Sequence, residues 1–361
     1  MSFLRRAPAW LLLALVALAG CGPEKRNPSP PVSAGPYAWP CLPVNWRTAF
    51  DSPVYRTYAL LVGGALLAGA LGLLIARFVF RRDVAKIWIT YRSWLFMAPL
   101  AFLVIGLGRE VTIVALTALS VLGVKEFARA TGLYRDWWMT GASYLAIVAT
   151  GVATLVGDPT YTGLHGWWGL FLAMPAFAIT VFVLIPILRD RVAGQLQYIA
   201  LTILAFLYLG WMFGHLPWLA NTNHAYGYLL YLIFAVELND IAAFTFGRIF
   251  GRHKLRPAIS PNKTWEGALG ALAVSMALPW LLRFSFPHFT PTDLILTGLI
   301  VGVGGQLGDL SISVIKRDLG VKDMGALIPG HGGVLDRIDS LLYTAPLFLH
   351  LIQNSHGIYA H

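Results

Sequence analysis

Charged side chains are scarce in this sequence of 361 residues, because Asp, Glu, Lys and Arg make up only 12% of it. A soluble domain carries about 25%. Hydrophobic residues make up 57%, and the mean hydropathy is +0.66. This composition excludes a water-soluble fold, which could not cover so much apolar surface, and it excludes intrinsic disorder, which needs the opposite composition. We therefore expect an all-α, polytopic integral membrane protein.

Cysteine is also scarce, and the two thiols of Cys21 and Cys41 make neither a disulfide framework nor a metal cluster. The sequence contains neither a His-Glu-x-x-His zinc motif nor a Gly-x-Ser-x-Gly nucleophile motif. The net charge of +10 does not indicate a nucleic-acid partner, because the basic residues lie between apolar spans rather than on one soluble face.

The N-terminus combines basic residues with a short apolar run. Two arginines precede the apolar residues 9–19, and the run ends at Cys21. This pattern is typical of a signal peptide or a bacterial lipoprotein signal over residues 1–21, and an uncleaved first helix is the alternative. Residues 22–56 are rich in proline, which favours an extended tether outside the cytoplasm.

Apolar stretches alternate with short polar breaks from residue 57 onward, and they predict ten transmembrane helices. The expected spans are 57–76, 93–108, 110–124, 139–156, 167–187, 198–214, 226–246, 267–283, 293–309 and 337–355. The second and third are short enough to form a re-entrant pair instead. We divide this part into an N-terminal transmembrane region, 57–225, and a catalytic transmembrane region, 226–355.

Lysine and arginine indicate how the spans are oriented. Most of the 27 basic residues fall in every second break, starting with the break after residue 76. The positive-inside rule places those breaks in the cytoplasm. We therefore expect a multi-pass protein of a bacterial inner membrane with its most polar loops in the cytoplasm.

The cytoplasmic break at 308–340 carries carboxylates, cations and glycines together. Two sets of polar residues recur at helical spacing, so that each set shares one helix face. They are Asp309, Ser313 and Lys316, and Asp336 and Asp339. Carboxylates for Mg²⁺, cations for phosphate and a glycine-rich turn are the parts that phosphoryl or nucleotidyl transfer needs. The alternative is a charged interfacial loop in which Asp and Lys pair with each other.

The cytoplasmic break at 239–267 supports the catalytic interpretation. Glu237 and Asp240 lie inside an apolar span near its end, and intramembrane carboxylates are functional by default, although pairing with a nearby arginine is the alternative. Residues 260–264 predict a polar turn before the next helix. Free N–H groups at that helix start, together with Lys263, would suit a phosphate.

The polar residues of these two segments resemble the signature of the phosphatidate cytidylyltransferase (CDP-diacylglycerol synthase) family. The matching positions in the later segment are Asp309, Ser313, Lys316, Arg317, Lys322, Asp323, Gly325, Ile328, Pro329, His331, Gly332, Gly333, Val334, Asp336, Arg337, Ile338 and Asp339. Those in the earlier segment are Asp240, Gly247, Arg248, Gly251, Arg252, His253, Lys254, Leu255, Ile259 and the run from Ser260 to Gly267. One position departs, because Ile312 stands where the family usually has Glu. Ile312 comes three residues after Asp309 and four before Lys316, so we expect its side chain on their helix face.

The resemblance implies transfer of a cytidylyl group from CTP to phosphatidate, giving CDP-diacylglycerol and pyrophosphate for phospholipid biosynthesis, with Mg²⁺ as cofactor. We assign the metal to Asp240, Asp309, Asp323, Asp336 and Asp339. Catalytic roles go to Asp240, Lys316, Arg317, Asp336 and Asp339. Substrate binding goes to Ser260, Lys263, Thr264, Lys322, His331, Gly332, Gly333 and Arg337.

Three alternatives stay open at this point. They are a CTP-dependent lipid kinase, a nucleotidyltransferase acting on another lipid phosphate, and an inactive scaffold or a transporter. Transporters usually place polar residues near the membrane midplane. Here the polar residues lie at one end of the spans, which favours an enzyme. The sequence also leaves open whether the chain forms a homodimer.

Overall fold

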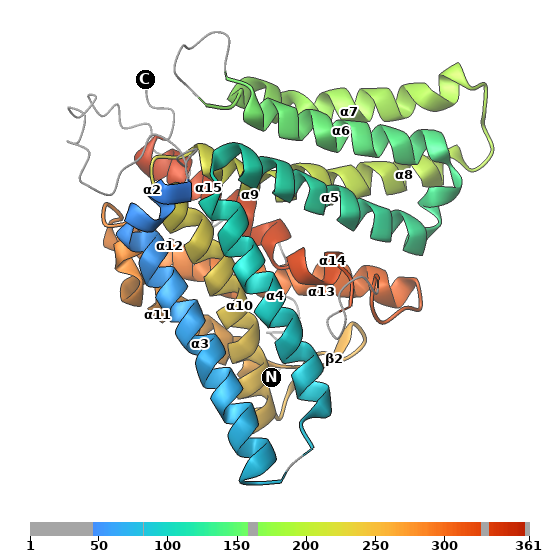
Figure 1. The fold of residues 1–361 in the computed structure, drawn as a ribbon. Helices are drawn as coiled ribbons and strands as arrows, with labels where there is room; N and C mark the ends of the chain where they lie inside the picture. The colour runs from blue at the N-terminus through green and yellow to red at the C-terminus, as the bar shows by residue number, and fades with distance from the viewer. Residues whose placement is uncertain (1–45, 82, 158–164, 326–331, 358–361) are drawn as a thin grey trace.

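The computed structural model describes residues 46–81, 83–157, 165–325 and 332–357, and Figure 1 shows how their helices are arranged. The expected signal segment, including Cys21, lies outside these residues. The α-helices are α2 (Trp46–Asp51), α3 (Pro53–Phe78), α4 (Ala85–Gly106), α5 (Arg109–Thr131), α6 (Trp137–Leu155), α7 (Trp168–Leu188), α8 (Gln195–Ala205), α9 (Phe213–Trp218), α10 (Ala225–Phe250), α11 (Trp265–Leu281), α12 (Pro291–Leu299), α13 (Gly305–Asp318), α14 (Leu335–Ile338) and α15 (Leu341–His356).

Several shorter elements connect or interrupt these helices. The 3₁₀ turns are η2 (Leu133–Arg135), η4 (Leu219–Asn221) and η5 (Arg283–Ser285), and the π-helical segments are η3 (Phe206–Met212) and η6 (Ile300–Gly304). In the described ranges, the β-strands are β1 (Lys254–Arg256) and β2 (Ser260–Thr264), which pair as a hairpin. The chain is therefore all-α in class, as the composition predicts.

Eight helices in the described part of the chain are long and apolar enough to cross a membrane. Each of the ten expected spans coincides with a helical segment, but α11 and α15 have only 17 and 16 residues. The α4 and α5 helices have 22 and 23 residues, so each is long enough to cross a membrane by itself. The short lengths on which the alternative of a re-entrant pair depended are therefore not observed.

The end of the expected tether is helical rather than extended. The α2 helix occupies part of it, and α3 begins at Pro53, before the predicted span. Ser52 caps α3 by accepting a hydrogen bond from the Tyr55 amide, and proline is well suited to the first turn that follows. Tyr55 also packs edge-on against Phe102, which holds this turn to α4.

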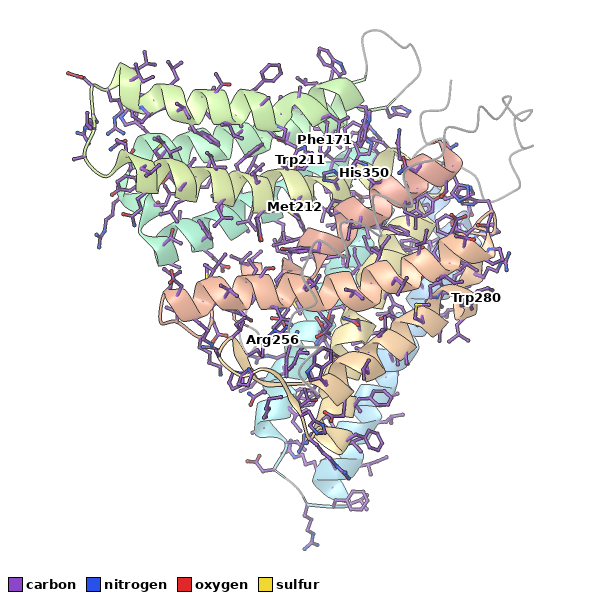
Figure 2. The ribbon with its side chains drawn as sticks, turned by 180° about the vertical axis from the view of Figure 1, so that it is seen from behind. Phe171, Trp211, Met212, Arg256, Trp280 and His350 are labelled. Atoms are coloured by element: carbon purple, nitrogen blue, oxygen red, sulfur yellow. The ribbon has the colours of Figure 1, made fainter. Side chains whose placement is uncertain are left out.

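The helices form two groups in Figure 1. The α5, α6, α7 and α8 helices lie alongside one another, whereas α3, α4 and α10 run together in a different direction. Trp168 of α7 packs edge-on against His350 of α15, with ring centroids 6.0 Å apart, and so joins the first group to α15. Phe171 and Trp211 lie close to His350 in Figure 2, and the Trp211 indole N–H donates to the Phe171 carbonyl at 3.2 Å.

The α10 and α11 helices pack so closely that glycine is required between them. A Cβ atom on Gly267 would lie 2.6 Å from the carbonyl oxygen of Ala243. The hairpin β1–β2 connects these two helices, with Lys254 paired to Thr264 and Arg256 to Ser260. The close helix pair thus forms the base from which the hairpin projects.

The segment 260–264 is a strand and not the expected polar turn, because it pairs with β1. Its last residue, Thr264, caps α11 by accepting from the Gly267 amide at 3.1 Å. The Trp265 amide donates to the His253 carbonyl at 2.9 Å. The amides of Trp265 and Gly267 are therefore not free for a phosphate, and the expectation was wrong for these two N–H groups.

Candidate active site

A cavity of about 530 Å³ lies where the adjoining ends of α10, α11 and α13 meet β2 and α14. Its walls combine residues from both polar segments of the sequence. The polar lining consists of Glu237, Asp240, Arg248, Asn262, Lys263, Thr264, Gln306, Asp309, Lys316, Asp323, Asp336, Arg337 and Asp339. The fold therefore brings most of the predicted site residues to one place.

An ion pair joins the hairpin to α13 inside this cavity. The Lys263 Nζ lies 2.7 Å from the Asp309 Oδ2, and it also donates to the Gln306 Oε1 at 2.9 Å. The other oxygen of Asp309 accepts from the Ser313 hydroxyl at 3.2 Å. The predicted helix face carrying Asp309 and Ser313 is thus confirmed.

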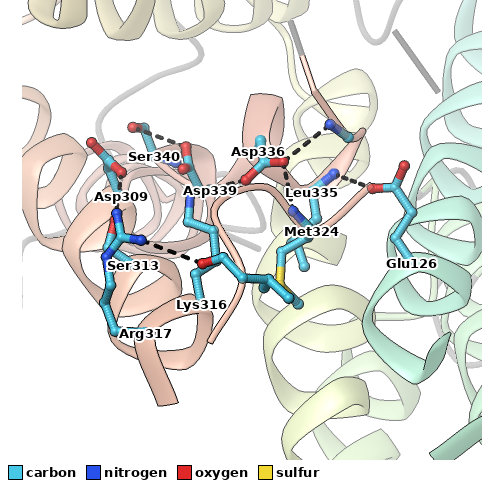
Figure 3. Close-up of polar contacts among 12 residues, drawn as sticks. Glu126, Asp309, Ser313, Lys316, Arg317, Met324, Leu335, Asp336, Asp339 and Ser340 are labelled. Carbon is cyan, nitrogen blue, oxygen red and sulfur yellow. Dashed lines mark hydrogen bonds and ion pairs between the residues drawn. The ribbon is translucent and has the colours of Figure 1, made fainter. Parts of the chain in front are cut away.

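A second ion pair joins α13 to α14. The Lys316 Nζ lies 2.9 Å from the Asp336 Oδ1, and both side chains are nearly buried (Figure 3). The Asp336 Oδ2 accepts from the amides of Met324 and Gly333, each at 3.0 Å. Both oxygens of Asp336 therefore have partners within the protein. Through the two amides, Asp336 holds the backbone at Met324 close to the backbone at Gly333.

Three carboxylates of the cavity act on one another electrostatically. They belong to Asp240, Asp309 and Asp339, and each lies near a cation or a hydrogen-bond donor that offsets the repulsion. Asp339 is 6% exposed, and its Oδ1 accepts from the Ser340 amide at 2.7 Å. The guanidinium of Arg337 also acts on Asp240. Carboxylates that repel one another favour a nearby cation.

The donor set of this cavity fits Mg²⁺ in its chemistry. Magnesium prefers oxygen ligands, and the three mutually repelling carboxylates supply them. Within the described residues, no three His, Cys, Asp or Glu side chains are already arranged to hold an ion. In this structure Lys263 occupies one side of Asp309, and Lys316 occupies one side of Asp336.

Several predicted site residues do not line the cavity. Arg317 is exposed, and its Nε donates to the Ile259 carbonyl at 3.1 Å. Lys322 is exposed and Ser260 lies on β2, and neither contributes to the wall. Gly332 and Gly333 lie just before α14. His331 falls outside the described residues.

Ile312 is 1% exposed and belongs to the hydrophobic core. It does not line the cavity, although its helical spacing from Asp309 and Lys316 led us to expect it on their face. The expectation was wrong because the apolar side chain turns toward the core at the edge of that face. The departure from the family pattern thus lies beside the cavity.

Sequence reasoning missed Glu126, which comes from α5 in the N-terminal region. Its Oε2 accepts from the Leu335 amide at 3.0 Å, at the start of α14. Lys125 and Arg129 lie at the same end of α5, so an acidic residue among them carries no distinctive signal. Gln306 and Asn262 were also missed, because neutral amides carry no distinctive pattern.

The fold and the cavity define a multi-span membrane protein with carboxylates and cations gathered at one end of its helices. The sequence matches the cytidylyltransferase family over residues 88–355. The chain therefore belongs to the cytidylyltransferase family, and as a member it is a nucleotidyltransferase. The resemblance found in the sequence is confirmed.

Individual relatives differ in how much of the chain they match. An uncharacterized protein of Escherichia coli (strain K12), YnbB, is 30% identical over 295 residues, which cover 78% of this chain and 94% of YnbB. A phosphatidate cytidylyltransferase of Staphylococcus haemolyticus is 43% identical over 150 residues, covering 41% of this chain and 56% of that enzyme. The corresponding enzyme of Staphylococcus aureus (strain COL) is 42% identical over 153 residues, covering 42% and 57%.

Proposed function

We propose that this protein transfers a cytidylyl group from CTP to phosphatidate, giving CDP-diacylglycerol and pyrophosphate. The observation that carries the proposal is the cavity in which Lys263 and Lys316 lie among the carboxylates of α10, α13 and α14. The staphylococcal relatives named as phosphatidate cytidylyltransferases support the choice of substrate, although the matches span just over half of their length.

The reaction needs charge neutralisation more than it needs a base. A phosphate monoester has a second pKa of about 6, so phosphatidate is largely a dianion near neutral pH and is already a nucleophile. Its phosphate oxygen forms a bond to the α-phosphorus of CTP. The bond from that phosphorus to the bridging oxygen breaks, and pyrophosphate leaves with the electron pair. The proposed role of Lys263, Lys316 and Arg337 is to bind these phosphates and reduce their repulsion.

Magnesium belongs to this proposal as the cofactor. Asp240, Asp309 and Asp339 would hold it, with Asp323 and Asp336 at the edge of the same cavity. When bound, the ion supplies further neutralisation of the phosphate charge. In this proposal the cavity residues orient the nucleotide. Lys263 leaves Asp309, and Lys316 leaves Asp336, and each lysine then binds a phosphate group.

We further propose that the cavity faces the cytoplasm of a bacterial inner membrane. The concentration of Lys and Arg at this end of the spans supports that orientation. The lipid would approach from the side. Phe244, which is 68% exposed, and Ala268 line the cavity on α10 and α11, where an apolar edge suits acyl chains.

The test is to incubate the purified protein with labelled CTP, phosphatidate and Mg²⁺ and to follow a lipid-soluble cytidine product. We expect that product together with pyrophosphate, and EDTA should abolish both. A labelled lipid phosphate formed from γ-labelled CTP would instead identify a kinase. A cytidine lipid that forms from another lipid phosphate, but not from phosphatidate, would overturn the proposed acceptor.

A further inference from the structure

Glu126 of α5 contacts the segment that carries Asp336, although the two are far apart in the sequence. The Glu126 Oε2 accepts from the Leu335 amide at 3.0 Å, and Leu335 is the first residue of α14 (Figure 3). The preceding residue, Val334, provides no side-chain hydrogen bond to the start of α14. Glu126 therefore supplies from another helix a bond that the local sequence does not provide.

Two glycines allow the Glu126 carboxylate to come this close. A Cβ atom on Gly325 would overlap the Glu126 Oε1, and a Cβ atom on Gly333 would overlap the Oε2. The Oε1 is buried and has no hydrogen-bond partner among the described residues. The Glu126 carboxylate is thus enclosed between Gly325 and Gly333. A larger side chain at either position would displace the carboxylate.

The hydrogen bond between Glu126 and Leu335 lies next to the residues that line the cavity. Asp336 and Arg337 follow Leu335 immediately, and both line the cavity. Asp336 holds Lys316 at 2.9 Å, while its other oxygen binds the Gly333 amide. A shift of the Leu335 backbone would therefore move the partner of Lys316 and the guanidinium of Arg337 together.

We infer that Glu126 is a positioning residue for the proposed nucleotidyl transfer, acting through the hydrogen bond to Leu335 that fixes Asp336 and Arg337 in the cavity. The inference rests on the proposed function for its catalytic consequence. The contact also makes the N-terminal helices part of the active site, because α5 lies outside both polar segments that carry the family signature.

The test compares Glu126→Gln with Glu126→Ala in the full-length protein. The glutamine oxygen can still accept from the Leu335 amide, so Glu126→Gln should keep kcat within about threefold. Alanine removes the acceptor, and a misplaced reacting group costs up to about a hundredfold. We expect Glu126→Ala to lower kcat by about tenfold or more, with less than about a threefold change in the KM for CTP. Glu110→Gln, on the same helix at its opposite end, is the matched control.

Hydrogen exchange of the Leu335 amide provides a second measurement that needs no catalysis. It should be about fivefold faster in Glu126→Ala than in the wild type, and close to the wild-type rate in Glu126→Gln. If the wild type makes no cytidine lipid, the proposed function fails, while the exchange rates still decide whether Glu126 holds this segment.

Three results would overturn the inference. They are a wild-type kcat in Glu126→Ala, an equal loss of kcat in Glu126→Gln and Glu126→Ala, and unchanged exchange of the Leu335 amide in Glu126→Ala. If Glu126→Ala does not fold, Glu126→Asp replaces it in both measurements, because its shorter side chain withdraws the carboxylate from the Leu335 amide.

Discussion

The Lys263 ammonium lies 2.7 Å from the Asp309 carboxylate and thereby joins the β1–β2 hairpin to α13. The two side chains are 18% and 29% exposed, so the pair is only partly screened by water. A corresponding pair, Lys316 with Asp336, lies deeper and joins α13 to α14. Both lysines that are proposed to bind phosphate are thus already paired with a carboxylate.

Replacing Lys263 by alanine should weaken nucleotide binding. The change removes a cation from the cavity and leaves Asp309 with less neutralisation, so that an incoming triphosphate meets more negative charge. We expect the KM for CTP to rise by about tenfold or more, measured in the cytidine-lipid assay. Lys254→Ala on the neighbouring strand, where the side chain is exposed, is the control. Equal KM values for the two variants would contradict the assignment.

The carboxylates of Asp339 and Asp336 should respond differently to replacement by asparagine. Asp339→Asn removes charge from a group of mutually repelling acids, so we expect a folded protein that is inactive at every Mg²⁺ concentration. Asp336→Asn breaks the ion pair with Lys316, and loss of one partner of a buried pair costs about 3–5 kcal/mol. Its melting temperature should therefore fall. A Mg²⁺ titration and thermal unfolding distinguish the two, and activity in Asp339→Asn would refute the metal role.

Glutamate at position 312 should destabilise the protein. Ile312 lies in the hydrophobic core at 1% exposure, and a carboxyl group without a partner there costs several kcal/mol. We expect a lower melting temperature for Ile312→Glu and, in the protein that folds, an unchanged Mg²⁺ dependence. Ile312→Val, which costs only about 0.5–1.5 kcal/mol, is the control for packing. A lower Mg²⁺ requirement in Ile312→Glu would show that the side chain reaches the cavity after all.

Acidification should destabilise the end of the bundle opposite the cavity. The His224 and His288 ring centres are 4.2 Å apart, and His356 lies 4.7 Å from His288. Burial and the neighbouring His224 lower the pKa of His288 to about 3, and burial also lowers the pKa of His224 and His356, although Asp293 opposes the shift at His356.

The unfolded chain therefore binds protons more readily than the folded one, because its histidines titrate near 6.5. Stability should be complete above about pH 6.5 and decrease from there toward pH 3. Thermal unfolding between pH 8 and pH 5 should show a falling melting temperature. His288→Gln should reduce that fall, and an identical pH dependence in the variant would contradict this account.

The transmembrane helices could be predicted because long apolar runs leave few other structures in a membrane. The shared face of Asp309 and Ser313 could be predicted from helical spacing. The hairpin could not, since its residues 254–264 are mostly polar and carry no alternating pattern. Its strands form because α10 and α11 pack in close contact at Gly267, so that only a short connection joins the two helices.

The partners of the charged residues could not be predicted from spacing within one segment. Glu126 and Leu335 are separated by 209 positions, and the helix packing that joins them involves many apolar side chains. Lys263 was expected to bind phosphate, but its distance from Asp309 depends on where the hairpin folds relative to α13. The sequence therefore indicated many of the residues that line the cavity, and packing determined how they are paired.

The two Lys–Asp pairs have a thermodynamic consequence for the order in which ligands bind. A phosphate competes with Asp309 for Lys263, and a divalent cation competes with Lys263 for Asp309. The ligand that binds first must break the Lys263–Asp309 pair. The ligand that binds second then meets a side chain that is already free of its ion-pair partner. Cation and nucleotide should thus show positive heterotropic cooperativity, and the factor by which Mg²⁺ tightens CTP must equal the factor by which CTP tightens Mg²⁺.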